Sequence, residues 1–170
     1  MKDFYDLFIH ELYDMYSAER QIVKALPDMA KAAHNPDLKE AFRVHRDETQ
    51  KQIERLEQVA HHLGIQYKDA ESPVMKEMLK EGKKIINSNY PSEVKDAALI
   101  TAAQRVEHYE MACYGILKAF AKEIDRKDIV KLLDESAHEE GKADKKLTEI
   151  AQGSLFNKGI NEKALKRKTA

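Results

Sequence analysis

The sequence has few of the residues that disulfide-bonded, iron–sulfur or membrane-spanning proteins require. Cys113 is the only cysteine among 170 residues, which excludes an intramolecular disulfide and any site that holds iron or zinc through several thiolates. Tryptophan is absent, and no apolar run reaches the roughly 18 residues of a membrane-spanning helix. The residues after Met1 form no signal-peptide pattern. We therefore expect a cytoplasmic protein without a membrane segment.

Glycine and proline are also scarce, at 6 and 4 residues, and together with abundant Ala, Glu, Lys and Leu this favours an all-α protein. Charged residues make up 35% of the chain, yet the formal net charge is only −1. Interspersed charges of both signs are typical of solvent-exposed helix faces, and this balance does not favour nucleic-acid binding. The length suits a single domain with a substantial core.

Apolar residues recur at steps of three and four over four long segments, a period that predicts helices. We expect these helices over residues 3–33, 36–63, 93–124 and 126–152. Asn35-Pro36 is a capping residue followed by a helix-starting proline, and Gly64 suits the end of the second helix. Ser92 and Asp125 are the expected caps of the third and fourth helices.

A long connection over residues 64–92 separates the second and third helices, and Ser72-Pro73 starts a short helix within it. A helix of about 28 residues is about 42 Å long, and only a connection of this length can return along it. We therefore expect two antiparallel hairpins joined by a crossover that contains a short helix, forming a four-helix bundle over residues 1–153. The third helix then runs parallel to the second.

The segment after the bundle, residues 154–170, shows little periodicity. Its basic residues are Lys158, Lys163, Lys166, Arg167 and Lys168. We expect this segment to be a basic, mobile C-terminal tail.

Carboxylates interrupt the apolar faces near the middle of all four helices. Burying an unpaired carboxylate is costly, so such positions need a compensating partner. In the first hairpin, Glu19 and Glu48 lie at similar distances from the turn. Glu107 and Glu139 do the same in the second hairpin. Four carboxylates at one level repel one another, and a pair of divalent metal ions would offset this repulsion. Oxygen and imidazole ligands without thiolates suit iron or manganese.

A di-metal site in a helical bundle takes one Glu from each of two helices and a Glu-x-x-His motif from each of the other two. The fourth helix contains such a motif, Glu135-Ser-Ala-His138, whereas Lys51 stands where the second helix would need a histidine. The predicted metal ligands are Glu19, Glu48, Glu107, Glu135, His138 and Glu139. The candidates for further ligands, or for side chains that orient the ligands, are His45, Gln52, Gln104 and Glu110.

Four of these candidates also have an interpretation without metal. Glu19 could be a half-exposed helix residue, and Glu107 could pair with Arg105 or with a lysine. His138 could be a surface histidine, and His45 could be a histidine at the edge of the core that hydrogen bonds to a carboxylate. If basic side chains neutralised the carboxylates in this way, the site would be vestigial.

Four segments resemble a known protein family: Leu12–Glu19 (LYDMYSAE), Ala25–Ala30 (ALPDMA), Asp96–Ile100 (DAALI) and Ala103–Glu110 (AQRVEHYE). Over about residues 4–152 the chain resembles the YciF/YciE family of bacterial ferritin-like stress proteins, and the basic tail lies outside this resemblance. The resemblance implies a rubrerythrin-like, ferritin-like four-helix bundle with a di-metal site, and a homodimer.

Together these features predict a stress-response protein with a carboxylate-bridged pair of metal ions, iron first and manganese as the alternative, that reacts with oxygen or peroxide. The corresponding enzyme would be a di-iron oxidase or peroxidase. One cysteine cannot build a rubredoxin domain, so any electrons would come from another protein acting as external donor. The alternative is a non-enzymatic helical stress protein that acts by binding a partner, with a structural or vestigial metal site.

Overall fold

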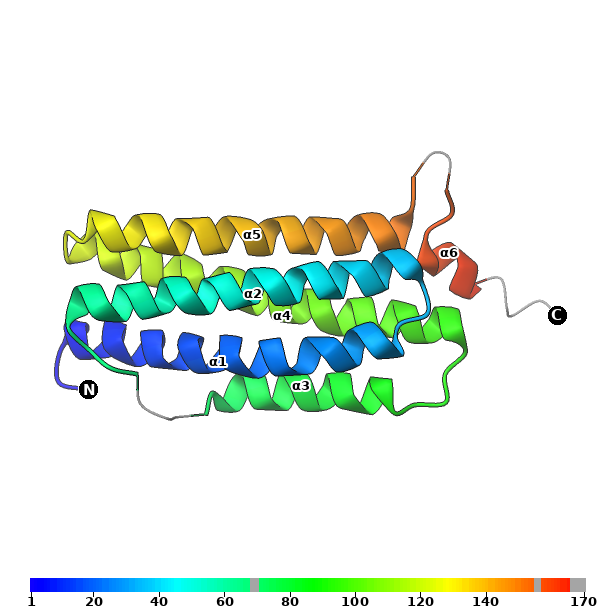
Figure 1. The fold of residues 1–170 in the computed structure, drawn as a ribbon, viewed down its shortest axis with the longest axis horizontal. Coiled ribbons are helices and arrows are strands. Elements are labelled where there is room, and N and C mark those ends of the chain that lie inside the picture. Colours follow the sequence, from blue (N-terminus) through cyan, green and yellow to red (C-terminus); the bar gives the residue numbers. More distant parts are fainter. Residues whose placement is uncertain (68–70, 155–156, 166–170) are drawn as a thin grey trace.

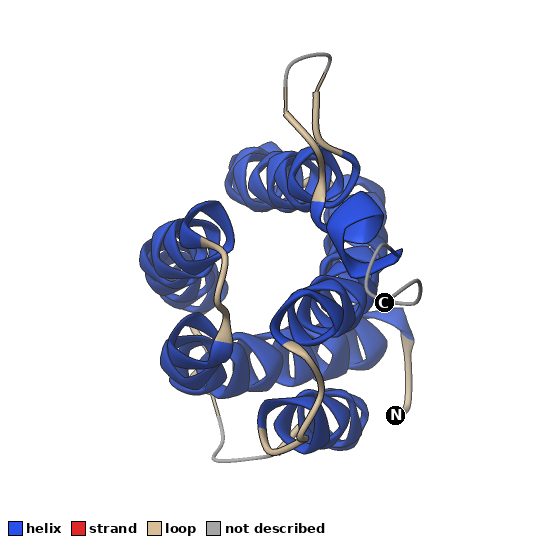
Figure 2. Ribbon diagram, turned by 90° about the vertical axis from the view of Figure 1, so that its right-hand side faces the viewer, coloured by secondary structure: helices blue, strands red, loops and turns tan. Residues whose placement is uncertain are grey.

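The computed structural model describes residues 1–67, 71–154 and 157–165, and its regular elements are helices. In chain order they are α1 (Phe4–Ala32), α2 (Pro36–Leu63), α3 (Pro73–Ile86), α4 (Ser92–Glu123), α5 (Lys127–Gln152) and α6 (Ile160–Leu165). The four long helices α1, α2, α4 and α5 form a bundle, and α3 lies on its outside against α1 and α4 (Figures 1 and 2). No helix in these residues is both long and apolar enough to cross a membrane. The predicted all-α fold class is confirmed.

The chain path matches the predicted pair of hairpins. α1 and α2 form the first antiparallel hairpin, and α4 and α5 form the second. The connection that contains α3 returns along the bundle, so α2 and α4 run in the same direction (Figure 1). This crossover allows both hairpins to bring the middles of their helices to one level.

The α1–α2 turn is held by side chains from both hairpins. Asn35 caps α2 as predicted, because its Oδ1 accepts the N–H groups of Asp37 and Leu38 at 2.8 and 3.1 Å. The buried carboxylate of Asp96, on α4, accepts the N–H groups of His34 and Asn35 at 2.7 and 2.8 Å. Asp96 therefore ties the second hairpin to the turn of the first.

The other helix ends differ in part from the predictions. Gly64 ends α2 in the left-handed region at φ 66°, as predicted. Ser92, the predicted cap of α4, is already helical, and Pro91 occupies the cap position. Asp125, the predicted cap of α5, adopts φ 53° in the turn, and Arg126 occupies the cap position. A capping residue needs an extended backbone, and the tight α4–α5 turn takes Asp125 out of that region.

Two apolar clusters fill the bundle, and a polar layer separates them. The cluster near the α1–α2 turn includes Ile22, Leu26, Leu38, Phe42, Leu99 and Leu147. The cluster near the α4–α5 turn includes Phe8, Leu12, Leu56, Leu117, Ile129 and Leu133. On each long helix, buried polar side chains lie between the residues of the two clusters. The polar layer thus crosses the bundle at mid-length, where the sequence predicted it.

The segment expected to be a mobile tail begins with an ordered return onto the bundle. Gly153 and Lys158 form an antiparallel bridge, and α6 then packs against α4 and α5. Ile160 is 2% exposed and joins the apolar cluster near the α1–α2 turn. The bridge and the buried Ile160 both attach residues 157–165 to the bundle. So short a segment carries no periodicity that would reveal it. The basic residues at 166–168 lie outside the described residues.

Candidate metal centre

Five ionisable side chains from the four long helices meet in the polar layer. They are Glu19 on α1, His45 on α2, Glu107 and Glu110 on α4, and Glu140 on α5. Their exposed fractions lie between 0% and 6%. His45, Glu107, Glu110 and Glu140 each offer one potential ligand atom, and these four atoms lie within 4.8 Å of one another. Glu19 lies beside them, where the charge of Glu140 acts on its carboxyl group. We call these five residues the carboxylate cluster.

His45 provides the positive charge nearest to the cluster carboxylates. Its Nε2 is 3.4 Å from Glu107 Oε1 and 3.9 Å from Glu140 Oε2. Its Nδ1 is 3.9 Å from Oε2 of Glu48, a residue on the same helix whose side chain is 34% exposed. Within the described ranges, the ion-pair contacts to the cluster carboxylates come from His45 alone. One imidazolium cannot neutralise four ionised carboxylates, so the cluster would carry excess negative charge if all four were ionised.

Two buried neutral side chains hold carboxylates of the cluster in place. The Tyr114 hydroxyl donates a hydrogen bond to Oε1 of Glu19, and the Gln52 amide donates one to Oε1 of Glu140. Gln52 also donates to Glu139 at 3.1 Å and so links the cluster to the outer side of α5. Both Tyr114 and Gln52 are fully buried. They restrict the orientation of the carboxylates without adding charge.

Burial and mutual repulsion raise the pKa of every carboxyl group in the cluster. At Glu19, burial is the main cause and the charge of Glu140 adds to it, and together they raise the pKa to about 8. Burial likewise raises the pKa of Glu107 and Glu110 well above the usual range, and it raises that of Glu140. Burial alone would lower the pKa of His45, but the neighbouring carboxylates outweigh it and raise the pKa to about 10. The metal-free cluster therefore holds protons at neutral pH that a cation would displace.

Many polar atoms of the cluster have no hydrogen-bond partner among the residues that the structure describes. These buried atoms are Glu19 Oε2, Glu107 Oε2, both carboxylate oxygens of Glu110, Glu140 Oε2 and both ring nitrogens of His45. Leaving a buried polar group unsatisfied costs about 1–3 kcal/mol, and more if the group is charged. Oxygen and imidazole donors without thiolates suit iron and manganese. The arrangement fits metal ions, which would occupy these lone pairs and offset the negative charge.

The structure brings several of the predicted site residues together. Glu19 and Glu107, both predicted ligands, belong to the cluster, as do the further candidates His45 and Glu110. Gln52 touches the cluster, and Glu48 lies at its edge. Gln104 lies elsewhere, because its amide donates to Asp144 and Thr148 at 3.0 and 2.9 Å.

The three ligands predicted on α5 lie outside the cluster. Glu139 forms two hydrogen bonds with the Arg55 guanidinium, at 2.6 and 2.7 Å. Glu135 Oε2 is 3.5 Å from Arg55 Nε, and His138 is exposed. The Glu135-x-x-His138 motif thus lies on the outer side of α5. The α5 residue that enters the cluster is Glu140, which the sequence analysis did not identify.

The cause of this miss is the register of α5. Leu132 and Leu133 are adjacent apolar residues, and Glu139 and Glu140 are adjacent glutamates. The buried face of this helix can therefore be drawn in two ways that differ by one residue: through Leu132 and Glu139, or through Leu133 and Glu140. The prediction followed Leu132 and Glu139. The structure instead buries Ile129, Leu133, Ser136, Glu140, Leu147 and Ala151. Steps of three and four residues from Leu133 lead through Ser136 to Glu140, and this spacing is the signal that would have identified Glu140.

Two cavities reach the carboxylate cluster. One, of about 410 Å³, lies between α1, α3 and α4 and has His45 and Glu107 in its lining. The other, of about 370 Å³, lies between α2 and α5 and is lined in part by His45, Glu48 and Glu107. Small molecules therefore have space beside the cluster.

The chain matches known proteins in both sequence and structure. The chain matches the family described as Domain of unknown function (DUF892) over residues 3–164. It is 42% identical to Protein YciF of Escherichia coli (strain K12) over 163 residues, which cover 95% of this chain and 98% of the relative. The crystal structure of the E. coli stress protein YciF matches with a TM-score of 0.89 over 93% of this chain and 100% of that chain. YcfI from Rhodopseudomonas palustris, also 42% identical, matches with a TM-score of 0.86 over 89% and 96%.

Proposed function

Because the chain belongs to the DUF892 family, as the resemblance in its sequence predicted, we propose that it is a stress-response protein whose carboxylate cluster binds a pair of divalent metal ions. Iron is the first choice and manganese the alternative, since both accept oxygen and imidazole ligands. One observation carries the proposal: four buried carboxylates and one imidazole meet with unsatisfied ligand atoms.

Glutamates from α1, α4 and α5 would supply the oxygen ligands, and His45 would supply nitrogen. Two divalent ions would balance four carboxylates, and His45 would bind as the neutral imidazole. Glu48, at the edge of the cluster, would complete the coordination from α2. When bound, iron supplies the electrons that reduce oxygen or peroxide, and an external donor would restore them.

Two side chains beside the cluster orient its carboxylates for metal binding. Tyr114 and Gln52 each hold the Oε1 atom of a carboxylate, Glu19 and Glu140 respectively, and leave Oε2 without a partner within the described residues. Each carboxylate is therefore oriented while one oxygen stays available to a metal. The apolar clusters cover the polar layer toward both ends of the bundle, and the two cavities border it from the sides. This arrangement supports a site built to hold ions.

The test starts with metal content. Metal-free protein would be loaded with Fe(II) without oxygen, freed of excess iron and analysed for iron per chain by mass spectrometry. We expect about two irons per chain in the wild type. Glu107→Gln keeps the size of the side chain but removes its charge, and should lose most of this iron. Glu135→Gln, on the outer side of α5, is the matched control and should bind iron like the wild type.

The second step tests reactivity. Peroxide or oxygen would be added in excess, and its consumption would be followed together with the near-ultraviolet absorbance. Consumption of many equivalents by the wild type, but not by Glu107→Gln, supports a peroxidase or oxidase. No retained iron in the wild type would refute metal binding. Retained iron without any reaction would refute the redox role and favour the alternative, a partner-binding stress protein with a structural metal.

A further inference from the structure

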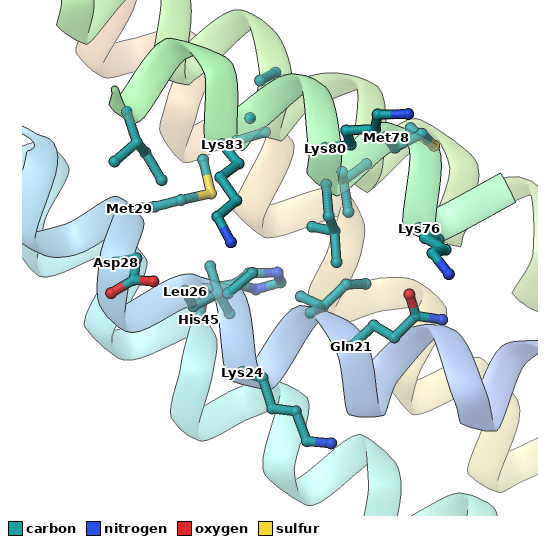
Figure 3. Close-up of a pocket in the computed structure, with 18 of the residues that line it drawn as sticks. Gln21, Lys24, Leu26, Asp28, Met29, His45, Lys76, Met78, Lys80 and Lys83 are labelled. Atoms are coloured by element: carbon teal, nitrogen blue, oxygen red, sulfur yellow. The ribbon is translucent and has the colours of Figure 1, made fainter. Parts of the chain in front are cut away.

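The larger of the two cavities beside the carboxylate cluster has room for an organic molecule. It lies between α1, α3 and α4 and has a volume of about 410 Å³ (Figure 3). Pockets for small organic ligands typically measure about 300–1,000 Å³. Oxygen or peroxide alone would need far less space than this.

The walls of this cavity are mainly apolar. They include Ile22, Leu26 and Met29 from α1 and Met78, Leu79 and Ile86 from α3. The three residues on α3 pack against the apolar cluster near the α1–α2 turn but are only half-buried. An apolar ligand in the cavity would complete their burial, and removal of apolar surface from water favours binding.

Gly82 marks volume that the protein itself does not fill. It is buried in the middle of α3 and lines the cavity. A Cβ atom added to Gly82 would meet no other side chain or neighbouring backbone within 4 Å. Protein interiors are normally packed closely, and glycine is otherwise unfavourable inside a helix. The open space beside Gly82 is therefore a feature of the cavity wall.

The rim of the cavity is basic. The lining carries Lys24, Lys76, Lys80 and Lys83 against two acidic residues, Asp28 and the buried Glu107 of the carboxylate cluster. Lys76 and Lys80 are paired with nearby glutamates at 2.6 and 3.1 Å. The Lys83 side chain has no hydrogen bond or ion pair to the part of the chain that the structure describes, and Figure 3 shows it pointing from α3 into the pocket. A cation of this kind beside an apolar wall suits an anionic group on the ligand.

We propose that this cavity binds a medium-chain fatty acid, with the hydrocarbon chain along the apolar walls and the carboxylate beside Lys83. At roughly 30 Å³ for each water-sized group, the cavity of about 410 Å³ holds about 14 non-hydrogen atoms, which accommodates the 12 of an acid of about ten carbons. A single carboxylate corresponds to the charge of Lys83, because Lys76 and Lys80 are paired with glutamates and Figure 3 shows Lys24 pointing away from the pocket. His45 and Glu107 border the cavity, but the apolar walls and Lys83 contain no proposed metal ligand, so binding of the acid can be tested on the metal-free protein.

Calorimetric titration of the metal-free protein with hexanoate, octanoate and decanoate tests the apolar walls. Each added methylene should strengthen binding about fourfold. Gly82→Leu places a side chain in the open space, and leucine favours the helix more than glycine does. This variant should therefore fold, and circular dichroism would verify that it does. We expect it to bind decanoate at least about tenfold more weakly, because a leucine side chain would occupy the apolar space.

The role of the charge is tested with decanol, which has the same chain length without the carboxylate. Lys83→Met keeps an apolar stem and removes the charge, so it should weaken decanoate binding about tenfold and leave decanol binding unchanged. The matched control is Lys84→Met. Lys84 neighbours Lys83 but pairs with Glu81 at 2.9 Å, and its loss should leave both ligands bound as in the wild type.

Three results would each overturn the inference. The wild type could show no saturable binding of decanoate, Gly82→Leu could bind it unchanged, or Lys83→Met could leave its affinity intact. All three are measured without metal, whereas the metal centre is tested by iron retention. Failure of one proposal is therefore distinguishable from failure of the other.

Discussion

Glu110 allows a direct test of the balance between metal binding and stability. Its side chain is fully buried, and neither carboxylate oxygen has a hydrogen-bond partner among the described residues. Burial raises its pKa well above the usual range. A buried polar group without a hydrogen-bond partner costs about 1–3 kcal/mol, and an apolar side chain of similar size removes that cost. We expect Glu110→Leu to raise the free energy of unfolding of the metal-free protein by about 2 kcal/mol, because it removes two unsatisfied acceptors.

Bound metal should make the wild type more stable than Glu110→Leu. A ligand that binds only the folded state stabilises it by about 4.1 kcal/mol when its concentration is 1,000 times the Kd. The wild type should gain this with Fe(II) or Mn(II). Glu110→Leu lacks one proposed ligand and should gain far less. The variant should thus be more stable than the wild type in chelator and less stable in metal.

Urea unfolding followed by circular dichroism at pH 7, with chelator or with metal, measures both quantities. Glu54→Leu is the matched control, because Glu54 is exposed on α2. It should change the free energy of unfolding by less than about 0.5 kcal/mol and keep the response to metal. If Glu110→Leu were less stable than the wild type in chelator, the cluster would not be a destabilising element. An undiminished response to metal would remove Glu110 from the ligand set.

Three further predictions follow from the same contacts. The free energy of unfolding of the metal-free protein should fall as pH rises from about 4.5 to 8, because folded Glu19 keeps its proton up to a pKa of about 8 while the unfolded chain releases it near 4.5. His45, with a pKa of about 10 against 6.5 when unfolded, adds a loss of the same sign between these values, and each proton contributes a slope of about 1.4 kcal/mol per pH unit. Urea unfolding at pH 5, 7 and 9 measures this, and greater stability at pH 9 than at pH 5 contradicts it. Asp96→Ala leaves two backbone N–H groups of the α1–α2 turn without their acceptor and should lower the free energy of unfolding by about 2–4 kcal/mol, with iron retention unchanged. Thermal unfolding checks this, and a Tm within about 1 °C of the wild type would refute it. Tyr114→Phe removes the hydrogen bond that lowers the pKa of Glu19, so metal affinity should drop several-fold at pH 6 and less at pH 8; a pH-independent effect in metal titrations would show that Tyr114 acts otherwise.

The apolar clusters stabilise the bundle, whereas the polar layer between them destabilises it when no metal is bound. The two apolar clusters supply most of the buried apolar surface, and the polar layer between them contains groups that are unfavourable without a cation. The layer is tolerated because the clusters and the Asp96 contact hold the helices together on both sides. The cluster can therefore be changed by mutation without loss of the fold, which makes the tests above practicable.

Much of the fold could be predicted from the sequence because long amphipathic helices carry a strong periodic signal. Helix spans, both hairpins and the direction of α4 agree with the structure. Glu19 and Glu107 could each be placed near the middle of the bundle, because the antiparallel helices of each hairpin bring equal distances from the turn together: Glu19 opposite Glu48, and Glu107 opposite Glu139. The family resemblance is confirmed over nearly the whole chain. The homodimer, the cytoplasmic location and the external electron donor stay predictions.

The sequence by itself determined where the four long helices lie and that the middle of each carries carboxylates, since both depend on local periodicity. Only the tertiary structure decided which carboxylates turn inward. Neighbouring residues on a helix differ by about 100°, so Glu139 and Glu140 could each border the core. The packing of α5 between α2 and α4 directs Glu140 into the cluster, and Arg55 pairs with Glu139 outside it. The cavity beside α3 is likewise a property of packing, because an outer helix shows its apolar face in the sequence but not the space that this face encloses.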